Sequence, residues 1–154
     1  MEQKTKLDAE AGKQDLVITR EFDLPLELLF KAYVEPEIVG QWMGTNVLKM
    51  ESKKHGSYRF ETTHDGKVVF QANGAIHELI PNRTIIRTFE MENTPFGVQL
   101  EVYNFEPLSD DQSKLTMHVI FESPAQRDQN MQLGLSWGVN MAHDRLQKIV
   151  SKLK

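Results

Sequence analysis

The sequence predicts an α+β domain in which one antiparallel sheet is covered by a long C-terminal helix. About 75 residues after Gly44 resemble a succession of strands that are separated by short turn-forming segments. Strands joined by short turns pair antiparallel, because a parallel pair needs a long crossover connection. The run from Asp128 to Leu153 contains no proline and carries apolar residues at helical spacing, which predicts the closing helix.

Length and composition indicate a single domain. A chain of 154 residues is large enough to build a core without disulfide or metal staples. We expect residues 1–14 to form a flexible N-terminal tail and residues 15–154 to form the domain. The net charge of −4 reveals no basic surface that would attract nucleic acid. The absence of cysteine excludes disulfides, thiolate metal sites and cysteine nucleophiles.

The chain carries no recognisable membrane segment. The first residues lack the apolar core of a secretory signal. No uninterrupted apolar run approaches the roughly 20 residues that span a bilayer. Together with the missing cysteines, which fit a reducing compartment, this pattern leads us to expect a cytoplasmic protein without membrane insertion.

The first part of the domain is predicted to form one strand and two short helices. Apolar residues in 16–22 favour the strand. Pro25 then stands where a helix begins, because proline is well tolerated at the first helical position. A second short helix follows Pro36 and is ended by Gly44.

The middle of the chain is predicted to form six further strands. Strict alternation is clearest in two of them. Tyr58 and Phe60 share one face of the second strand, and Met117 and Val119 share one face of the last. The turns between strands contain glycine, proline, asparagine and aspartate, which are typical of hairpins. The six candidate strands are 46–52, 56–63, 68–80, 83–91, 98–106 and 113–122.

The predicted C-terminal helix has one unusual feature. Gly134 and Gly138 stand four residues apart beside its apolar side, and each costs roughly 1 kcal/mol relative to alanine in a helix. Two explanations are tight packing against the sheet and room left for a ligand. We therefore expect both glycines to face the sheet or a cavity beside it. The apolar side consists of Met131, Leu135, Ala142, Leu146, Ile149 and Leu153.

Four motifs occur in the same order as in a known family. The first is LLFKAYVEPEIVGQWMG at 28–44, an apolar helix followed by a proline-acid step and a tryptophan before glycine. The second is SKKHGSYRFE at 52–61, where His55 replaces a family glycine. The others are GAIHELIPNRTIIRTFE at 74–90 and LGLSWGVNMAHDRLQKIV at 133–150. Together they resemble the START-like (helix-grip) superfamily, and within it the homologues of the C-terminal domain of the activator of the heat-shock protein 90 ATPase.

This resemblance implies a curved antiparallel sheet of about seven strands wrapped around the long C-terminal helix, with two short helices after the first strand. A sheet of this shape can leave a cavity beside the helix. The superfamily includes lipid and hormone binders, polyketide cyclases and proteins that sequester small molecules. Because one fold hosts many functions, the residues of the site must carry the functional argument.

The residues show no catalytic, metal or cofactor motif. The five histidines lack paired ligand spacing, and Ser57 and Ser136 lie outside any GxSxG elbow. No glycine-rich phosphate loop is present. We therefore expect no metal, no cofactor and no catalytic residue, and we favour a binding protein over an enzyme.

Three charged residues lie inside predicted strands. Arg59 alternates with two aromatic residues and should point to solvent. The orientation of Glu78 and Arg87 is ambiguous, and we expect both to be hydrated at strand ends. If they were buried, they would have to pair with each other or with a ligand. With Tyr103, these two residues are the candidate polar anchors of a cavity.

Our leading hypothesis is a protein that binds a hydrophobic or aromatic small molecule between the sheet and the C-terminal helix. Small-molecule sites are largely apolar with a few polar groups, and methionine adapts to irregular apolar ligands. The predicted lining residues are Trp42, Tyr58, Phe60, Ile76, Phe89, Met117, Gly134, Trp137, Gly138 and Met141.

Two alternatives stay open. By likeness to the chaperone-activating homologues, the protein would bind a chaperone through its outer surface, although no sequence feature encodes that contact. Alternatively, it would be a cyclase or hydrolase in which Glu78, Arg87 or Tyr103 positions a substrate. Recovery of a chaperone in a pull-down would support the first alternative. Loss of turnover in a folded Glu78→Gln variant would support the second.

Overall fold

The computed structural model describes residues 4–154, which form one eight-stranded antiparallel sheet and four α-helices. The strands lie in the order β1-β2-β8-β7-β6-β5-β4-β3. The strands are β1 (Lys6–Asp8), β2 (Asp15–Phe22), β3 (Asn46–Met50), β4 (Ser57–His64), β5 (Lys67–Ile80), β6 (Thr84–Met91), β7 (Val98–Pro107) and β8 (Ser113–Ile120). The helices are α1 (Leu26–Val34), α2 (Pro36–Met43), α3 (Pro124–Gln132) and α4 (Leu135–Val150), followed by the 3₁₀ turn η1 (Ser151–Leu153).

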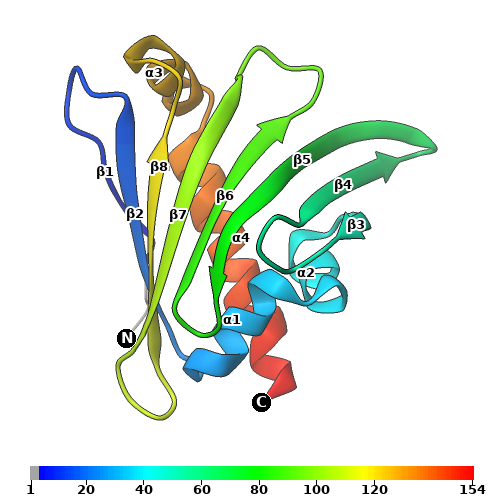
Figure 1. Cartoon of the computed structure of the whole chain (residues 1–154), viewed down its shortest axis with the longest axis vertical. Coiled ribbons are helices and arrows are strands. Elements are labelled where there is room, and N and C mark those ends of the chain that lie inside the picture. The colour runs from blue at the N-terminus through cyan, green and yellow to red at the C-terminus, as the bar shows by residue number, and fades with distance from the viewer. Residues whose placement is uncertain (1–3) are drawn as a thin grey trace.

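The helices cover one face of the curved sheet. Figure 1 shows α4 crossing behind the middle of the sheet, with α1 and α2 near one end of it. The core fills the space between them, because strands with alternating residues bury every second side chain. Ile18, Leu115 and Met117 are buried from the sheet side, while Leu146 and Val150 are buried from α4.

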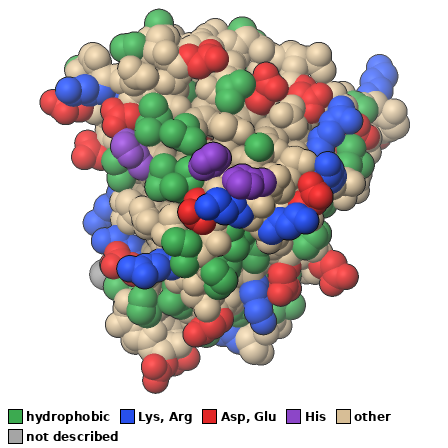
Figure 2. All heavy atoms as spheres, in the orientation of Figure 1, with side chains coloured by type: hydrophobic (Ala, Val, Ile, Leu, Met, Phe, Trp, Pro, Cys, Tyr) green, Lys and Arg blue, Asp and Glu red, His purple; other side chains and the backbone are tan. Residues whose placement is uncertain are grey.

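The opposite face of the sheet meets solvent. Figure 2 shows acidic, basic and histidine side chains mixed with hydrophobic ones over this face. Arg59 lies there, and its Nε is 3.2 Å from a carboxylate oxygen of Glu92. The outward orientation predicted for Arg59 is therefore confirmed.

The predicted fold class is confirmed, with one additional strand. The seven expected strands and the two short helices after the first of them are present. The additional strand is β1, in which Leu7 pairs with Ile18 of β2. Residues 6–8 of the expected flexible tail are thus part of the sheet. Within residues 4–154, no helix combines the length and apolarity needed to cross a bilayer.

The C-terminal helix is interrupted, and the prediction of one helix over 128–153 is wrong. α3 begins four residues earlier, at Pro124, where the Ser123 hydroxyl caps it by accepting a hydrogen bond from the Gln126 amide. Gly134 then adopts φ +92°, a left-handed conformation that ends α3 and precedes α4. Such a conformation costs other residues a steric penalty that glycine avoids.

The expectation that Gly134 and Gly138 face the sheet or a cavity beside it is wrong for Gly134, whereas Gly138 does not pack on the sheet but does line a cavity next to it. Both are exposed, and a Cβ atom built on either would meet nothing within 4 Å. The buried side of α4 runs instead through His143, Leu146 and Val150. Close approach to a backbone occurs at Gly74 of β5, where an added Cβ would lie 2.0 Å from the Thr88 carbonyl oxygen.

Candidate functional site

A cavity of about 480 Å³ lies between the helix-covered face of the sheet, α2 and α4, and it is open to solvent. We call it the sheet–helix cavity. Aromatic, methionine and aliphatic side chains make up most of its wall. It is lined by Tyr33, Val39, Trp42, Met43, Phe60, Phe70, Arg87, Phe89, Gln99, Glu101, Tyr103, Met117, Leu135, Trp137, Gly138, Val139, Met141, Ala142, His143 and Arg145.

The structure brings many of the predicted site residues to this cavity. Trp42 is buried, and its indole nitrogen donates a hydrogen bond of 2.6 Å to the Ala32 carbonyl, which fixes the ring against the wall. Trp137 is 70% exposed, so it stands beside the opening instead of pointing inward as predicted. The predicted residues that line the cavity are Trp42, Phe60, Phe89, Met117, Trp137, Gly138, Met141, Arg87 and Tyr103.

Four predicted residues lie elsewhere. Tyr58 and Ile76 are buried in a small apolar cluster beneath α2. Gly134 immediately precedes α4 and is not among the residues that line the cavity. Glu78 has a carboxylate oxygen 3.8 Å from the Lys54 ammonium and remains partly exposed, as expected for a hydrated residue.

The β6–β7 part of the sheet supplies a buried polar floor. Arg87 Nε donates a hydrogen bond of 2.9 Å to Oε1 of Glu101, and Arg87 Nη2 donates one of 2.7 Å to the Tyr103 hydroxyl. That hydroxyl donates in turn to the same Glu101 oxygen at 2.8 Å. Gln99 donates to the other oxygen, Oε2. We call Arg87, Glu101 and Tyr103 the polar floor.

The polar floor corrects the prediction for Arg87, which was expected to be hydrated or to pair with Glu78. It is 7% exposed and pairs with Glu101, its direct cross-strand partner. A bulge between Ile76 and Glu78 shifts the register of β5 against β6. Because a bulge inserts an extra residue and reverses the alternation beyond it, Glu78 turns away from Arg87.

Glu101 was missed by the sequence reasoning, although a signal for it exists. Gln99, Glu101, Tyr103 and Phe105 stand two residues apart in β7 and therefore share one face. Since two of the four are aromatic residues directed to the core, the same alternation places the Glu101 carboxylate inside. The same reasoning applies to Arg20, which alternates with buried Ile18 and Phe22 and is itself buried.

The guanidinium of Arg87 is charged and tightly held. Burial opposes the charge of Arg87, but the surrounding Tyr103, Tyr58 and Glu101 raise the pKa of its guanidinium well above the ordinary value. Burial raises the pKa of the Tyr103 hydroxyl, so that this group stays protonated. The guanidinium carbon also lies 4.8 Å from the ring centroid of Tyr58 and 4.9 Å from that of Tyr103. Such cation–π contacts favour a fixed guanidinium.

His143 of α4 is a neutral member of the cavity wall. It is 3% exposed, and burial together with the nearby Arg20 charge lowers its pKa to about 4. Its Nδ1 lies 2.7 Å from the Thr5 hydroxyl, so the N-terminal segment packs on α4 here. Arg20 binds the same region through an ion pair of 2.9 Å with Asp144.

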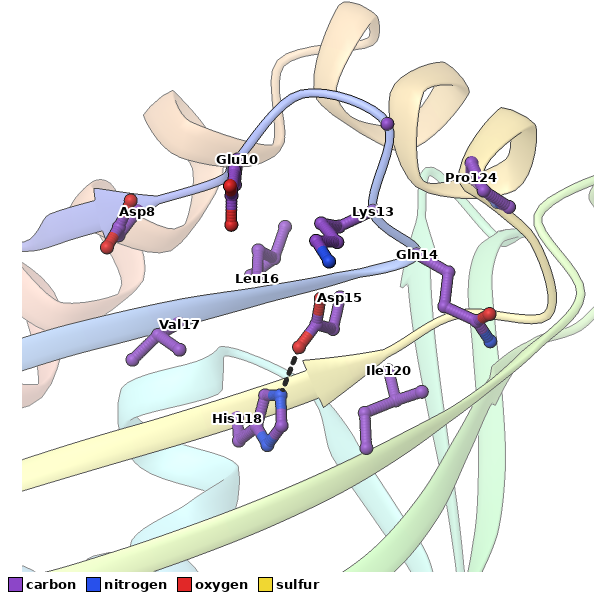
Figure 3. Close-up of a pocket in the computed structure, with 11 residues that line it drawn as sticks. Asp8, Glu10, Lys13, Gln14, Asp15, Leu16, Val17, His118, Ile120 and Pro124 are labelled. Carbon is purple, nitrogen blue, oxygen red and sulfur yellow. Dashed lines mark hydrogen bonds and ion pairs between the residues drawn. The ribbon is translucent and has the colours of Figure 1, made fainter.

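A second hollow, of about 800 Å³, lies on the outer face of the sheet below the β1–β2 connection. Figure 3 shows His118 of β8 pointing toward Asp15 of β2, and its Nε2 is 2.6 Å from the carboxylate. The hydrogen bond from His118 is the main reason that the pKa of Asp15 is lowered. Asp8, Glu10 and further polar residues line this hollow, which has no aromatic ring other than the imidazole. The sheet–helix cavity is therefore the better candidate for an organic ligand.

The described part of the chain offers little for metal or nucleophilic chemistry. Within residues 4–154, no group of three or more histidine, aspartate and glutamate side chains is arranged to hold a metal ion. The sheet–helix cavity contains no serine, threonine or cysteine in its lining. Its chemistry is that of an aromatic wall above one hydrogen-bonded ion pair.

An antiparallel sheet curved around a closing helix, with a cavity between them, defines the helix-grip, START-like class of protein. Within that class, the chain belongs to the family described as Activator of Hsp90 ATPase homolog 1-like protein, whose model matches residues 23–151. No curated protein is significantly similar to the sequence.

Solved structures share this fold at low sequence identity. A crystal structure of a protein from Rhodobacter sphaeroides is 19% identical with a TM-score of 0.83, over 98% of this chain and 99% of that one. A solution structure from Arthrobacter aurescens is 17% identical with a TM-score of 0.84, over 96% and 91%. A crystal structure of a protein from Mycobacterium smegmatis is 19% identical with a TM-score of 0.82, over 95% and 96%.

Proposed function

We propose that this protein binds a small hydrophobic or aromatic molecule in the sheet–helix cavity and holds it without chemical conversion. The observation that carries the proposal is the cavity wall. The cavity has a volume of about 480 Å³, which lies within the range of roughly 300–1,000 Å³ typical of small-molecule sites. Trp42, Phe60, Phe70 and Phe89 supply flat apolar surface, and Met117 supplies an adaptable one.

Ligand binding is better supported than the two alternatives. An enzyme needs a group that transfers a proton or attacks a substrate, whereas the Glu101 carboxylate and the Tyr103 hydroxyl are already engaged in hydrogen bonds with Arg87 and with each other. Glu78, the residue considered for catalysis, lies outside the cavity lining. A co-chaperone role rests on family likeness alone, and its test is recovery of a chaperone in a pull-down.

A thermal-shift screen tests the proposal. Compounds with one to three fused or linked aromatic rings should raise the melting temperature, because a ligand that binds only the folded state stabilises it by mass action. The control is an Ala142→Phe variant, whose added ring extends from α4 into the cavity. The proposal fails if no compound raises the melting temperature, or if the variant responds as strongly as the wild type.

A further inference from the structure

We infer that the cavity ligand is an uncharged molecule with a carbonyl-type oxygen that accepts a hydrogen bond from Nη1 of Arg87. This inference rests on the proposed function and adds the class of ligand. It follows from three properties of the polar floor. The guanidinium is fixed in place, one of its nitrogens has no hydrogen-bond partner among residues 4–154, and its charge is already balanced.

The guanidinium is fixed by contacts on several sides. Glu101 and Tyr103 take hydrogen bonds from Nε and Nη2, and the Tyr58 and Tyr103 rings lie against the guanidinium carbon. A donor that is already oriented loses little conformational entropy when a ligand binds to it. Arg87 is therefore a preorganised donor in the wall of the cavity.

The remaining nitrogen, Nη1, makes no hydrogen bond within the described residues. Among these residues, the only fully buried side-chain nitrogen or oxygen without a partner is Nε of Arg20. Nη1 of Arg87 therefore retains access to the cavity that Arg87 lines. A ligand that covers this donor without offering an acceptor would replace water and leave the hydrogen bond unmade, which is costly, so an acceptor at this position is favoured.

The strongest unpaired hydrogen-bonding group of the polar floor is a charged donor, Nη1 of Arg87. Oε1 of Glu101 already accepts from Arg87 and Tyr103, and Oε2 accepts from Gln99. The Tyr103 hydroxyl both donates and accepts. A carbonyl oxygen of a ligand pairs with this donor, whereas a ligand whose only polar group is a donor would leave Nη1 unpaired.

Charge balance favours a neutral ligand over a carboxylate. Glu101 compensates the Arg87 charge within a single ion pair of 2.9 Å. A carboxylate placed at Nη1 would add a second negative charge close to the buried Glu101, and like charges repel more strongly beside an apolar wall than in bulk water. The other charged lining residue, Arg145, is exposed to water, and His143 is neutral near pH 7.

Three probes of matched shape test this inference. They are 2-ethylnaphthalene, 2-acetylnaphthalene and 2-naphthoate, which carry a hydrocarbon, a ketone and a carboxylate at the same position. Isothermal titration calorimetry should show that the ketone binds about tenfold more tightly than the hydrocarbon, as expected for a hydrogen bond to a charged donor. The carboxylate should bind more weakly than the ketone.

A variant with an apolar floor removes the donor without leaving a buried charge. In the triple variant Arg87→Met/Glu101→Leu/Tyr103→Phe, the ketone and the hydrocarbon should bind with equal affinity. The matched control is Arg59→Met/Glu92→Leu, which removes an arginine–glutamate pair from the outer face and should keep the ketone preference. A measurement that needs no variant is the ¹³C shift of the labelled ketone carbonyl, which should move downfield on binding because a hydrogen bond polarises the carbonyl.

The outcomes separate this inference from the proposed function. If the hydrocarbon binds but the ketone gains nothing, the inference is wrong and small-molecule binding stands. Equal or tighter binding of the carboxylate also overturns the inference, as does a ketone preference that persists in the apolar-floor variant. If none of the three probes binds to the wild type, the proposed function fails together with the inference.

Discussion

The Arg87–Glu101 pair places two opposite charges in the buried part of the protein. Replacing Glu101 by leucine alone leaves an uncompensated guanidinium in the core, which should cost roughly 3–5 kcal/mol of folding free energy. The triple variant Arg87→Met/Glu101→Leu/Tyr103→Phe replaces the whole polar floor by apolar groups, and we expect it to be about as stable as the wild type. Urea denaturation of both variants measures these free energies.

The control for this prediction is the exposed pair on the outer face. Glu92→Leu leaves Arg59 free to be solvated, so its stability should change little. If Glu101→Leu is as mild as Glu92→Leu, the guanidinium must be hydrated, and the description of the floor as buried would be wrong.

His143 should make folding stability depend on pH. Its pKa is lowered from 6.5 to about 4 in the folded protein, so between these values the unfolded chain binds a proton that the folded chain does not. Stability is therefore greatest above about pH 6.5 and falls as the pH drops toward 4. By linkage, about 2 kcal/mol should be lost between about pH 7.5 and pH 5.

A His143→Gln variant isolates this effect, because glutamine retains a hydrogen-bonding group near Thr5 without titrating. The difference in unfolding free energy between wild type and variant should shrink by the same amount over that pH range. Asp15 contributes separately, since its lowered pKa acts only near and below pH 4. An unchanged difference between wild type and variant from pH 7.5 to 5 would show that His143 is hydrated.

At the scale of the element, the two glycines of the C-terminal segment should respond oppositely to alanine. Gly138 lies inside α4 with open space around it, so Gly138→Ala should stabilise the protein by up to about 1 kcal/mol. Gly134 has φ +92°, so Gly134→Ala should destabilise it by about 1 kcal/mol or more. Thermal unfolding of the two variants measures this, and a gain in both would mean that α3 and α4 can join into one helix.

Substitutions of Gly138 also test whether ligands enter the cavity beside this residue. It lines the sheet–helix cavity next to Trp137, and a leucine at this position would narrow the opening. Gly138→Leu should therefore weaken probe binding, while Gly138→Ala should leave it unchanged. Equal binding by the two variants, measured by calorimetry, would place the entrance elsewhere.

The elements differ in how far sequence predicts them. Strand alternation and turn residues predict β2 to β8 correctly, because burial of one face imposes a period of two. The break at Gly134 was not predicted, because a glycine in an apolar-periodic run fits either a helix interior or a left-handed stop. The hydration of Glu78 was correctly expected. The burial of Arg87 was not, because it depends on a partner in the neighbouring strand, and the sequence of one strand does not determine which residue lies opposite.

At the scale of the whole molecule, the order of elements and four short motifs are enough to predict the helix-grip fold. The family match over residues 23–151 and the solved structures agree with that prediction. A cavity is harder to predict from sequence than the fold, because it exists only where the sheet and the helix do not pack fully against each other. The sequence therefore predicted the type of residue that lines the site, while the polar floor and the exposure of Trp137 required the three-dimensional arrangement.

The most direct test of small-molecule binding uses the two tryptophans of the chain, Trp42 and Trp137, which both line the sheet–helix cavity. Each gives one indole signal in a ¹H–¹⁵N NMR spectrum. On titration with 2-acetylnaphthalene, both signals should shift and saturate at one ligand per protein, and neither should shift in the Ala142→Phe variant. Indole signals that stay unchanged up to the solubility limit of the probe would contradict binding in this cavity.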